Sequence, residues 1–503
     1  MAKFKVAAVL SNHMVLQRDK NIRIFGEGED GRKVAVTFQG TEYSGTVKGE
    51  KWTVMIPPQD AGTGYEMKVA CGEETRTFRN IAVGEVWLAG GQSNMEYELQ
   101  NCTGGDHMLK NDRNPNVRFY YTLKNANMDE TFFELEERSG WSEFGPETAG
   151  CWSAAGYVFG KRLAARLGVT VGIIGCNWGG TSASSWMSEE SLSEDKELSS
   201  YLEEYNLAVS GKPEEQQIKE YREYEEFQAD WDLRYRAELE KNPAAEWDEI
   251  VEILGKNRWP GPMVCINPYR PAGLYHCMLR RIIPYTLRGF IYYQGESDEH
   301  KPGMYQKLLT RLIRQWREDW EDLTLPFLIV QLTMHRNRKD PDYKHWCLLR
   351  EAQMNTYQTV KNTGIAVITD CGAFNDIHPK DKIPVGERLA LQAGYHVYHN
   401  LPGKEAFGPI YHSYAVRENG IELFFEHAED GFTVKGDGAG FELAGEDMNF
   451  IPVIPEMRAS VIYLHSPEIP YPAAARYCWT NYGEVTVYGK NGLPLAPFRT
   501  YRD

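Results

Sequence analysis

The stretch Gly84-Glu-Val-Trp-Leu-Ala-Gly-Gly-Gln-Ser-Asn-Met95 organises the interpretation of the whole chain. Val86 to Ala89 form a short apolar run typical of a buried strand. Two adjacent glycines end it, because paired glycines permit a tight turn that other residues resist. Ser93 stands where the chain leaves the strand, and a serine held at such a turn presents its hydroxyl as a nucleophile. The stretch differs from the Gly-x-Ser-x-Gly elbow, because Met95 occupies the place of the last glycine. A serine that caps the next helix fits the same residues, so the remaining sequence has to decide between nucleophile and cap.

The composition is that of a soluble globular protein, with 42% hydrophobic and 25% charged residues. The 503 residues exceed the length of one ordinary core, so we expect two or three domains. A formal net charge of -16 argues against a nucleic-acid partner and against an anionic membrane surface. No stretch of the sequence approaches a membrane span.

The nine cysteines are scattered, odd in number and without a Cys-x-x-Cys pair. Neither zinc binding nor redox chemistry is therefore indicated, and we expect no metal or other cofactor. The N-terminus lacks the apolar core of a signal peptide, which together with free thiols favours a cytoplasmic protein. A chain from which a signal peptide had been removed would begin in the same way.

Three regions differ in their sequence pattern. Residues 1–80 alternate apolar and polar residues between Gly-rich turns, which predicts a β-sandwich-like domain. Residues 81–404 alternate strands with helices, which predicts an α/β domain with a parallel sheet covered by helices. Residues 405–503 return to β character and predict a C-terminal β-domain.

The α/β region contains five apolar runs that we expect to be strands: Val86–Ala89, Val169–Ile174, Gly289–Tyr293, Pro326–Leu332 and Ile365–Thr369. Apolar residues recur at helical spacing between them. This spacing predicts three helices: Ser153–Leu167, Met304–Trp320 and Arg350–Val360.

Residues 188–257 interrupt this alternation and are rich in Glu, Lys, Arg and Tyr. We expect two or three exposed helices inserted in a loop, and a solvated insertion without chemistry is the simpler interpretation. The alternative is a lid or a surface for a homo-oligomer, and Trp231, Tyr235 and Trp247 would then be its contacts.

The residues that follow each predicted strand are the candidates for chemistry, because ligands of open parallel sheets bind beyond the carboxyl ends of the strands. Four of the five exits carry the polar residues and glycines that acyl transfer requires, which favours Ser93 as nucleophile over cap. The five exits are Gly91-Gln-Ser-Asn94, Asn177-Trp-Gly-Gly-Thr181, Gln294-Gly-Glu-Ser-Asp298, Met334-His-Arg336 and Asp370-Cys-Gly-Ala-Phe-Asn-Asp-Ile-His-Pro379.

His378 is the predicted base, because an imidazole with an ordinary pKa of about 6.5 takes and returns a proton near neutrality. Asp376 is the predicted acid that holds the imidazole tautomer, and the order Ser, Asp, His is allowed among triads. An ordinary loop turn before a helix also fits Asp376 to Pro379. His335, in a charged loop beside Arg336, is the rival base.

The oxyanion of a tetrahedral intermediate needs N–H donors with close access. Gly179 and Gly180 offer such donors because no Cβ blocks the approach, and the N–H of Ser93 is a second donor. The side-chain amide of Gln294 is a third candidate, with a capping or supporting role as its alternative. Glu296 either braces its loop or orients the histidine, and we favour bracing.

Four of these segments, together with three others, resemble the sialate O-acetylesterase family, within the SGNH-type hydrolases. The resemblance spans nearly the whole chain. It implies an SGNH/flavodoxin-like parallel sheet and a serine esterase that acts on O-acetylated sugars without a metal. The matching segments are Gly91–Met95, Trp178–Thr181, Tyr293–Ser297, Asn375–Pro379, Arg270–Tyr275, Leu349–Gln353 and Gly492–Arg499.

The resemblance places the nucleophile on Ser93, the base on His378, and oxyanion donors on Ser93, one glycine of the Gly179-Gly180 pair, and Gln294. Many SGNH hydrolases carry the acid three residues before the histidine, where this chain has Asn375. Asp376 lies two residues before it, so Asp370 and Glu296 remain substitutes for the triad acid.

The resemblance implies O-acetylated sugars or oligosaccharides as substrates, either sialic acids or fragments of plant polysaccharides such as xylan. Trp178, Trp186 and Trp346 lie near the exits and are candidates to stack on a sugar ring, although such aromatics are more often core. One rival interpretation is a catalytically silent carbohydrate-binding protein. Another is a glycosidase that uses Glu296 and Asp298 as paired carboxylates.

Overall fold

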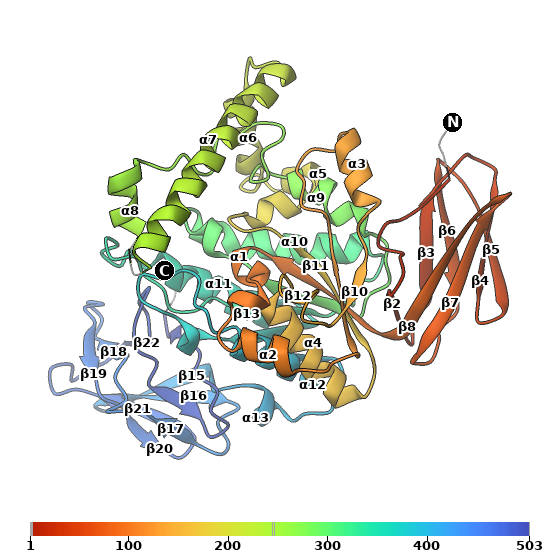
Figure 1. The fold of residues 1–503 in the computed structure, drawn as a ribbon. Coiled ribbons are helices and arrows are strands. Elements are labelled where there is room, and N and C mark those ends of the chain that lie inside the picture. Colours follow the sequence, from red (N-terminus) through yellow and green to blue (C-terminus); the bar gives the residue numbers. More distant parts are fainter. Residues whose placement is uncertain (1–3, 244, 246, 502–503) are drawn as a thin grey trace.

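A parallel sheet forms the centre of the protein (Figure 1), whose computed structural model describes residues 4–243, 245 and 247–501. Six parallel strands follow the order β9-β11-β8-β12-β13-β14, and β10 pairs antiparallel with β9 at one edge. Both faces of such a sheet are covered, so its strands are largely apolar. The strands are β8 (Glu74–Gly91), β9 (Val117–Tyr121), β10 (Trp141–Glu143), β11 (Val171–Asn177), β12 (Gly289–Tyr293), β13 (Phe327–Gln331) and β14 (Thr363–Val367).

Two pairs of helices cover the sheet, α4 (Ala154–Leu167) with α12 (Ile383–His396) and α10 (Tyr305–Asp319) with α11 (His345–Thr359). In β8, Trp87 packs on Phe159 of α4, with ring centroids 5.2 Å apart. Gly90, three residues later, lies against Trp316 of α10. Residues three apart in a strand point to opposite faces, so the two pairs cover opposite faces.

All five predicted strands of the α/β region are present, and so are its three predicted helices. The third of these begins earlier than expected, at His345 rather than at Arg350. The sequence analysis missed β9 and β10, which extend the sheet on the side of β11. The predicted fold class, a parallel α/β sheet with flanking β regions and a helical insertion, is confirmed.

The N-terminal region is built from strands, and β8 runs out of it into the central sheet, with β7 and β2 paired along its first half (Figure 1). The boundary expected near residue 80 therefore falls inside one continuous strand. The strands are β1 (Lys5–Val6), β2 (Val15–Gln17), β3 (Ile22–Glu27), β4 (Lys33–Phe38), β5 (Thr41–Thr46), β6 (Lys51–Ile56) and β7 (Gly62–Cys71).

Four helices form the insertion: α5 (Glu189–Ser193), α6 (Ser199–Val209), α7 (Glu214–Lys241) and α8 (Trp247–Leu254). The long helix α7, with α6 and α8, projects from the body of the molecule (Figure 1). Trp231 is buried, and its ring lies 5.3 Å from that of Tyr235 and 5.2 Å from that of Trp247. The three aromatic residues singled out in the sequence thus pack on one another and join α7 to α8.

The C-terminal region consists of small antiparallel sheets. It contacts the central domain through the loop after β13, where both carboxylate oxygens of Asp342 accept hydrogen bonds, from the hydroxyl of Thr480 and from the backbone N–H of Asn481, each at 2.7 Å. The strands are β15 (Ile410–Arg417), β16 (Gly420–Glu426), β17 (Phe432–Val434), β18 (Phe441–Ala444), β19 (Ile451–Val453), β20 (Glu456–Arg458), β21 (Val461–His465), β22 (Ala474–Tyr477), β23 (Val487–Gly489) and β24 (Phe498–Arg499).

Short helices connect these elements. The α-helical ones are α1 (Ser93–Glu96), α2 (Gly105–Asn111), α3 (Glu130–Glu136), α9 (Gly273–Cys277) and α13 (Gly403–Ala406). The 3-10 turns are η1 (Leu99–Asn101), η2 (Ala183–Trp186), η3 (Leu279–Arg281), η4 (Glu296–Asp298), η5 (Pro302–Met304) and η6 (Thr369–Cys371). None of the helices in the described part of the chain has the length and apolar sequence that crossing a bilayer requires. All nine cysteines are free thiols.

Candidate active site

Ser93 is the first residue of α1, directly beyond the carboxyl end of β8. Gly91 adopts φ 133°, and a Cβ there would collide with the backbone of β12. A Cβ on Gly90 would lie 2.8 Å from the ring of Trp316. The two glycines therefore allow close packing and a sharp turn, which fix where the serine side chain projects. Gln92 is the N-cap of α1 and its side chain makes no capping bond, so the interpretation of Ser93 as a cap is wrong.

Ser93 and His378, 285 residues apart in the chain, meet at the carboxyl edge of the sheet, and Oγ of the serine lies 2.7 Å from Nε2 of the histidine. His378 belongs to the loop after β14, which lies three strands away from β8. A hydroxyl and an imidazole nitrogen at this separation are within the reach that proton transfer requires. Ser93 and His378 therefore lie in contact, as the positions of the strand exits predicted.

The surroundings of His378 lower its pKa. Burial has the largest effect, because a desolvated imidazolium is disfavoured. The ammonium of Lys382 lowers the pKa further, whereas the carboxylate of Asp376 raises it. The ring consequently stays neutral, and able to accept a proton, at more acidic pH than an ordinary histidine.

Asp376 lies in the same loop, and its Oδ1 accepts a hydrogen bond from the backbone N–H of His378 at 2.9 Å. Its contact therefore shapes the loop, and its charge favours the imidazolium. Asp370, one of the two substitutes, is engaged elsewhere, because both of its oxygens accept hydrogen bonds from the guanidinium of Arg388 at 2.5 and 2.8 Å. Asp376 remains the predicted triad acid.

A buried polar cluster connects the serine turn to the histidine loop. Asn94 donates from Nδ2 to Oε1 of Glu296 at 2.6 Å and to the carbonyl of Ile377 at 3.0 Å. Nζ of Lys382 donates to Oδ1 of Asn94 and to the carbonyl of Pro379, each at 2.6 Å. Because Ile377 and Pro379 flank the predicted base, the cluster fixes the base relative to the nucleophile.

The charges in this cluster are strongly desolvated. Burial raises the pKa of Glu296, and burial lowers the pKa of Lys382 to about 8. Each departure disfavours the charged form of a group removed from water. The contacts of Glu296 are those of a brace, which agrees with the role that we favoured for it.

The two glycines after β11 lie beside the serine turn. A Cβ on Gly179 would lie 3.2 Å from Cβ of Ser93, and the N–H of Gly179 donates to Oε2 of Glu96 at 2.6 Å. Gly180, the predicted oxyanion donor, adopts φ 77°, which glycine tolerates. The N–H of Ser93 is the first of α1, where N–H groups have no partner inside the helix. Two of the predicted donors thus come from neighbouring turns.

The amide of Gln294 serves a different purpose in this structure. Nε2 donates to the carbonyl of Thr181 at 3.2 Å and to Oδ2 of Asp298 at 2.6 Å. Both N–H groups of the amide are therefore engaged, as its supporting role would require. Donation from Gln294 to an oxyanion stays a prediction.

Asp298 is buried and accepts four hydrogen bonds, which come from the hydroxyl of Ser182 at 2.6 Å, the backbone N–H of Ala183 at 3.0 Å, the hydroxyl of Tyr201 at 3.2 Å and the amide of Gln294 at 2.6 Å. These bonds tie the loop after β12 to η2 and to the insertion. The paired-carboxylate interpretation needs two carboxyl groups that face a substrate. Asp298 holds the interior together instead.

The rival base and two of the three candidate stacking residues lie in the core. His335 is buried against Trp346, with ring centroids 4.9 Å apart, and burial lowers its pKa. Trp186 and Trp346 are also buried, whereas Trp178 is half-buried. The partner of the serine hydroxyl in this structure is His378 rather than His335.

Trp259 and Tyr269 lie at the site, and the sequence analysis did not single them out. A Cβ on Gly180 would lie 2.8 Å from Cζ2 of Trp259 and 3.0 Å from Cε1 of Tyr269. The indole is 54% exposed. The only local signal for it was an aromatic residue in the Pro- and Gly-rich segment after the insertion.

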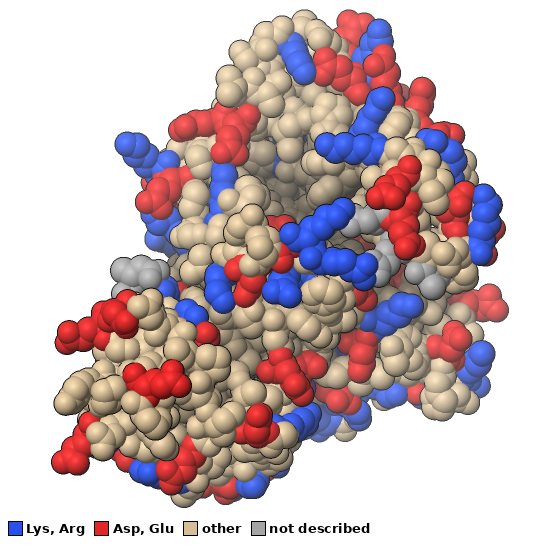
Figure 2. All heavy atoms as spheres, turned by 90° about the vertical axis from the view of Figure 1, so that its left-hand side faces the viewer, with Lys and Arg blue, Asp and Glu red and all other residues tan. Residues whose placement is uncertain are grey.

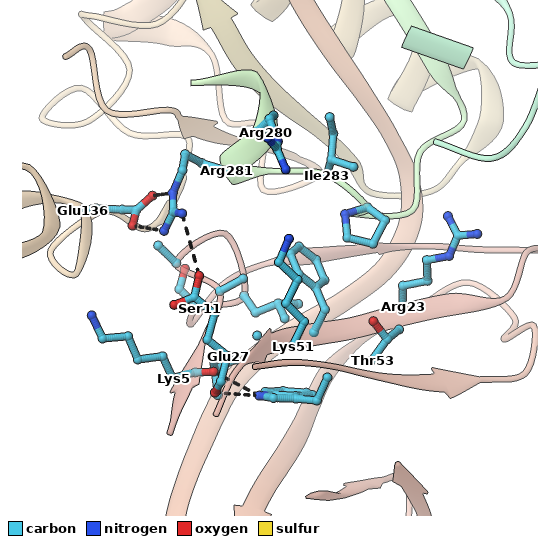
Figure 3. Close-up of a pocket in the computed structure, with 18 of the residues that line it drawn as sticks. Lys5, Ser11, Arg23, Glu27, Lys51, Thr53, Glu136, Arg280, Arg281 and Ile283 are labelled. Carbon is cyan, nitrogen blue, oxygen red and sulfur yellow. Dashed lines mark hydrogen bonds and ion pairs between the residues drawn. The ribbon is translucent and has the colours of Figure 1, made fainter. Parts of the chain in front are cut away.

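The surface is hollowed below the projecting helices of the insertion on the face that Figure 2 shows, and lysine and arginine side chains lie at the rim. A separate cavity of about 990 Å³ lies at the amino ends of the strands, between β3 and β6 and the segment that contains Arg280 and Arg281 (Figure 3). Its lining, as far as the chain is described, includes neither Ser93 nor His378.

Metal chemistry has no ligand set in the described residues, because no group of three or more His, Cys, Asp or Glu side chains is placed to hold an ion. A serine and a histidine in contact at the carboxyl edge of a parallel α/β sheet form the arrangement that nucleophilic catalysis by a serine hydrolase requires.

Comparisons with known proteins agree with this class. Residues 265–393 match the family described as "Carbohydrate esterase, sialic acid-specific acetylesterase". The chain is 26% identical to the sialate O-acetylesterase of Mus musculus over 427 residues, which cover 78% of this chain and 73% of the relative. It is 24% identical to the enzyme of Homo sapiens over 429 residues, 78% of this chain and 70% of the relative.

A solved structure extends the likeness to the whole chain. The crystal structure of a carbohydrate acetylesterase from Xanthomonas citri has a TM-score of 0.77, 28% sequence identity, and 99% coverage of both chains. The chain is a carboxylic ester hydrolase that is similar to the sialate O-acetylesterases and to a carbohydrate acetylesterase.

Proposed function

We propose that the protein removes acetyl groups from O-acetylated carbohydrates through an acetyl-enzyme on Ser93, with His378 as general base. The observation that carries the proposal is the 2.7 Å contact between Oγ of Ser93 and Nε2 of His378. A neutral imidazole in that position takes the hydroxyl proton as the oxygen attacks. The lowered pKa of His378 supports this role, because the ring stays neutral to lower pH than an ordinary histidine does.

The reaction has two halves. Oγ of Ser93 adds to the ester carbonyl while His378 takes its proton, and the oxyanion lies near the N–H groups of Ser93 and Gly180. The bond to the sugar oxygen then breaks, and the imidazolium returns the proton to the leaving hydroxyl. Water repeats the sequence on the acetyl-enzyme, releasing acetate and restoring the serine.

Asp376 and the cluster around Lys382 have supporting roles in this proposal. The carboxylate of Asp376 stabilises the imidazolium by its charge. Asn94 and Lys382 hold the serine turn and the histidine loop in register through buried hydrogen bonds. Such fixed geometry is what converts an encounter of two side chains into efficient proton transfer.

The substrate is proposed to be a small O-acetylated sugar or oligosaccharide. Relatives named sialate O-acetylesterases support acetylated sialic acids. Acetylated fragments of plant polysaccharides such as xylan are the second candidate. The nine free cysteines support a cytoplasmic location, where short oligosaccharides rather than polymers would be the substrates. A homo-oligomer remains a prediction.

Acetate release across a substrate panel tests the proposal. The panel holds acetylated sialic acids, acetylated xylo-oligosaccharides and acetylated manno-oligosaccharides, with acetate measured by an enzyme-coupled assay. We expect wild type to release acetate from at least one class and Ser93→Ala to release none above background. Inactive wild-type protein that still binds the sugars would favour a silent binding protein. Reducing ends released without acetate would favour a glycosidase.

Ser153 provides a matched control for this experiment. Like Ser93, it lies at the start of a helix, but it precedes that helix, and its Oγ accepts a hydrogen bond from the backbone N–H of Gly156 at 2.9 Å, as a true N-cap does. Ser153→Ala should lower the free energy of unfolding by about 1 kcal/mol and keep acetate release. Equal loss of activity in both variants would show that the loss with Ser93→Ala comes from the fold.

A further inference from the structure

An exposed tryptophan stands beside the predicted nucleophile. Trp259 lies in the segment between the insertion and α9, and 54% of its surface is exposed. A single exposed hydrophobic side chain is ordinary on a protein surface. Trp259 differs from such residues in its position, its orientation and the rigidity of the segment that holds it.

The indole lies across a two-glycine turn from Ser93. Gly179 packs against the serine, since a Cβ on it would lie 3.2 Å from Cβ of Ser93. Gly180 packs against the indole, since a Cβ on it would lie 2.8 Å from Cζ2 of Trp259. Consecutive Cα atoms are about 3.8 Å apart, so a small group attached to Ser93 lies within reach of the indole.

Hydrogen bonds fix the orientation of the indole. Nε1 of Trp259 donates to the hydroxyl of Tyr269 at 3.0 Å, and the two rings meet edge to face with centroids 5.5 Å apart at 74°. The backbone N–H of Trp259 donates to Oδ1 of Asn257 at 2.6 Å. The polar edge of the indole is therefore engaged by the protein, while more than half of the residue stays open to solvent.

A buried asparagine makes the segment rigid. Nδ2 of Asn267 donates to the carbonyls of Pro260 and Pro262 at 3.1 and 2.9 Å, and its Oδ1 accepts from the backbone N–H of Tyr269 at 2.7 Å. Asn267 itself is fully buried. The platform is thus held in place before any ligand arrives, which removes part of the entropy loss of binding.

We propose that Trp259 is the stacking platform for the pyranose ring that carries the acetyl ester. The inference rests on the proposed function, because it takes Ser93 as the atom that the ester must reach. A pyranose has an apolar C–H face and a polar rim, and an aromatic face held next to a polar site matches both. The platform therefore selects cyclic alcohols as leaving groups over acyclic ones.

The insertion offers a tryptophan for a matched control. Trp247 of α8 is 51% exposed, almost the same fraction as Trp259, but it packs on Trp231 and Tyr235. Its substitution removes an indole of equal size and similar exposure. If selectivity depends on where the indole lies, Trp259→Ala will lose it and Trp247→Ala will keep it.

The experiment compares two acetyl esters that differ only in the alcohol. One is a methyl pyranoside with a single O-acetyl group, taken from the sugar class that wild type deacetylates, and the other is ethyl acetate. For each variant, acetate release gives kcat and KM, and the ratio of the two kcat/KM values reports selectivity for the ring. Ethyl acetate is preferred to an aryl acetate, because an aromatic alcohol would itself stack on the indole.

For Trp259→Ala we expect the ratio to fall about tenfold, mostly through a higher KM for the pyranoside. The variant removes a contact with the ring that is common to the ground state and the transition state, and loss of such binding raises KM. Trp259→Phe should restore part of the ratio, and Trp247→Ala should leave it at the wild-type value.

Two results would overturn the inference. Equal losses on both esters with Trp259→Ala would mean that the indole only supports the Gly180 turn. Unchanged kcat/KM values for both esters would mean that the ring is bound elsewhere. Failure of the proposed function looks different, because wild type would then hydrolyse neither ester, or Ser93→Ala would hydrolyse both. Circular dichroism melting curves show that each variant is folded when it is assayed.

Discussion

The loops after β12 and β14 leave the same edge of the sheet, separated by β13, and both carry carboxylates in a polar sequence. In the first loop, Gln294, Glu296 and Asp298 are buried, and their hydrogen bonds run to neighbouring turns. In the second loop, His378 is half-buried and reaches Oγ of Ser93. Similar residue types thus stabilise the structure in the first loop and contact the predicted nucleophile in the second.

Polar residues that follow a strand therefore do not by themselves identify a group that takes part in the reaction. Asp298 accepts four hydrogen bonds and has no direction left in which to act on a substrate. His378 retains a ring nitrogen in contact with a hydroxyl. Burial together with satisfied hydrogen bonds marks a brace, and a contact to a nucleophile marks the reacting loop.

The largest expected effect is a loss of activity when the loop after β14 loses its histidine. His378→Ala should lower kcat at least about a thousandfold, because the serine loses its base. The free energy of unfolding should change by less than about 1 kcal/mol, since the side chain is only partly buried. Steady-state acetate release and urea unfolding measure the two quantities. A variant that keeps a tenth of its activity would remove His378 from the mechanism.

The next effect appears in stability. Asp298→Ala leaves four donors without an acceptor in the interior, so the free energy of unfolding should fall by about 3–5 kcal/mol. Urea unfolding followed by tryptophan fluorescence measures it. Activity should follow the folded fraction, so that the protein still folded retains kcat. A stable variant with no activity would assign Asp298 to the reaction and undo the contrast between the loops.

Much of the fold could be predicted because its signals are local. Continuous apolar runs predicted the strands β8, β11, β12, β13 and β14, and helical spacing predicted the helices α4, α10 and α11. The strand β9 was missed because Arg118 interrupts its apolar run. Its guanidinium is buried and donates to the carbonyl of His13 at 3.0 Å. The same guanidinium pairs with the carboxylate of Glu143 at 3.0 Å, and partners this far away in the sequence do not show in the local pattern.

The site could be predicted in part. Turn glycines and strand exits pointed to Ser93 and His378, because parallel strands bring their carboxyl ends together. The use of both Gln294 N–H groups could not be predicted, since their acceptors belong to Thr181 and Asp298 and depend on side-chain directions. Trp259 reaches the site only through a loop that folds back from the insertion, which no sequence spacing indicates.

A smaller effect concerns the acid of the reacting loop. Asp376→Asn should lower kcat about ten- to a hundredfold, because the imidazolium loses the nearby negative charge that stabilises it. The carboxylate raises the pKa of His378, so its removal should move the acidic limb of the kcat/KM profile to lower pH. A pH series with a sugar acetate measures both. Full activity with an unmoved limb would show that Asp376 is only a loop residue.

The smallest effect tests Lys382, which connects the serine turn to the loop after β14. Lys382→Met removes a positive charge that lowers the pKa of His378. Because the pKa of Lys382 is about 8, its ammonium is charged in the acidic range where the histidine titrates. The acidic limb of kcat/KM should therefore move to higher pH, opposite to the shift with Asp376→Asn. A shift to lower pH would contradict the charge balance described for the site.

The formation of an acetyl-enzyme on Ser93 tests the central claim most directly. Wild type is mixed with an O-acetylated sugar that it hydrolyses, the mixture is quenched in acid within milliseconds, and the digested protein is mapped by mass spectrometry. We predict one acetyl group, carried by the peptide that contains Ser93, and none in His378→Ala. Acetyl on another residue, or rapid turnover with no acetylated peptide at any time, would contradict the assignment of Ser93 as the nucleophile.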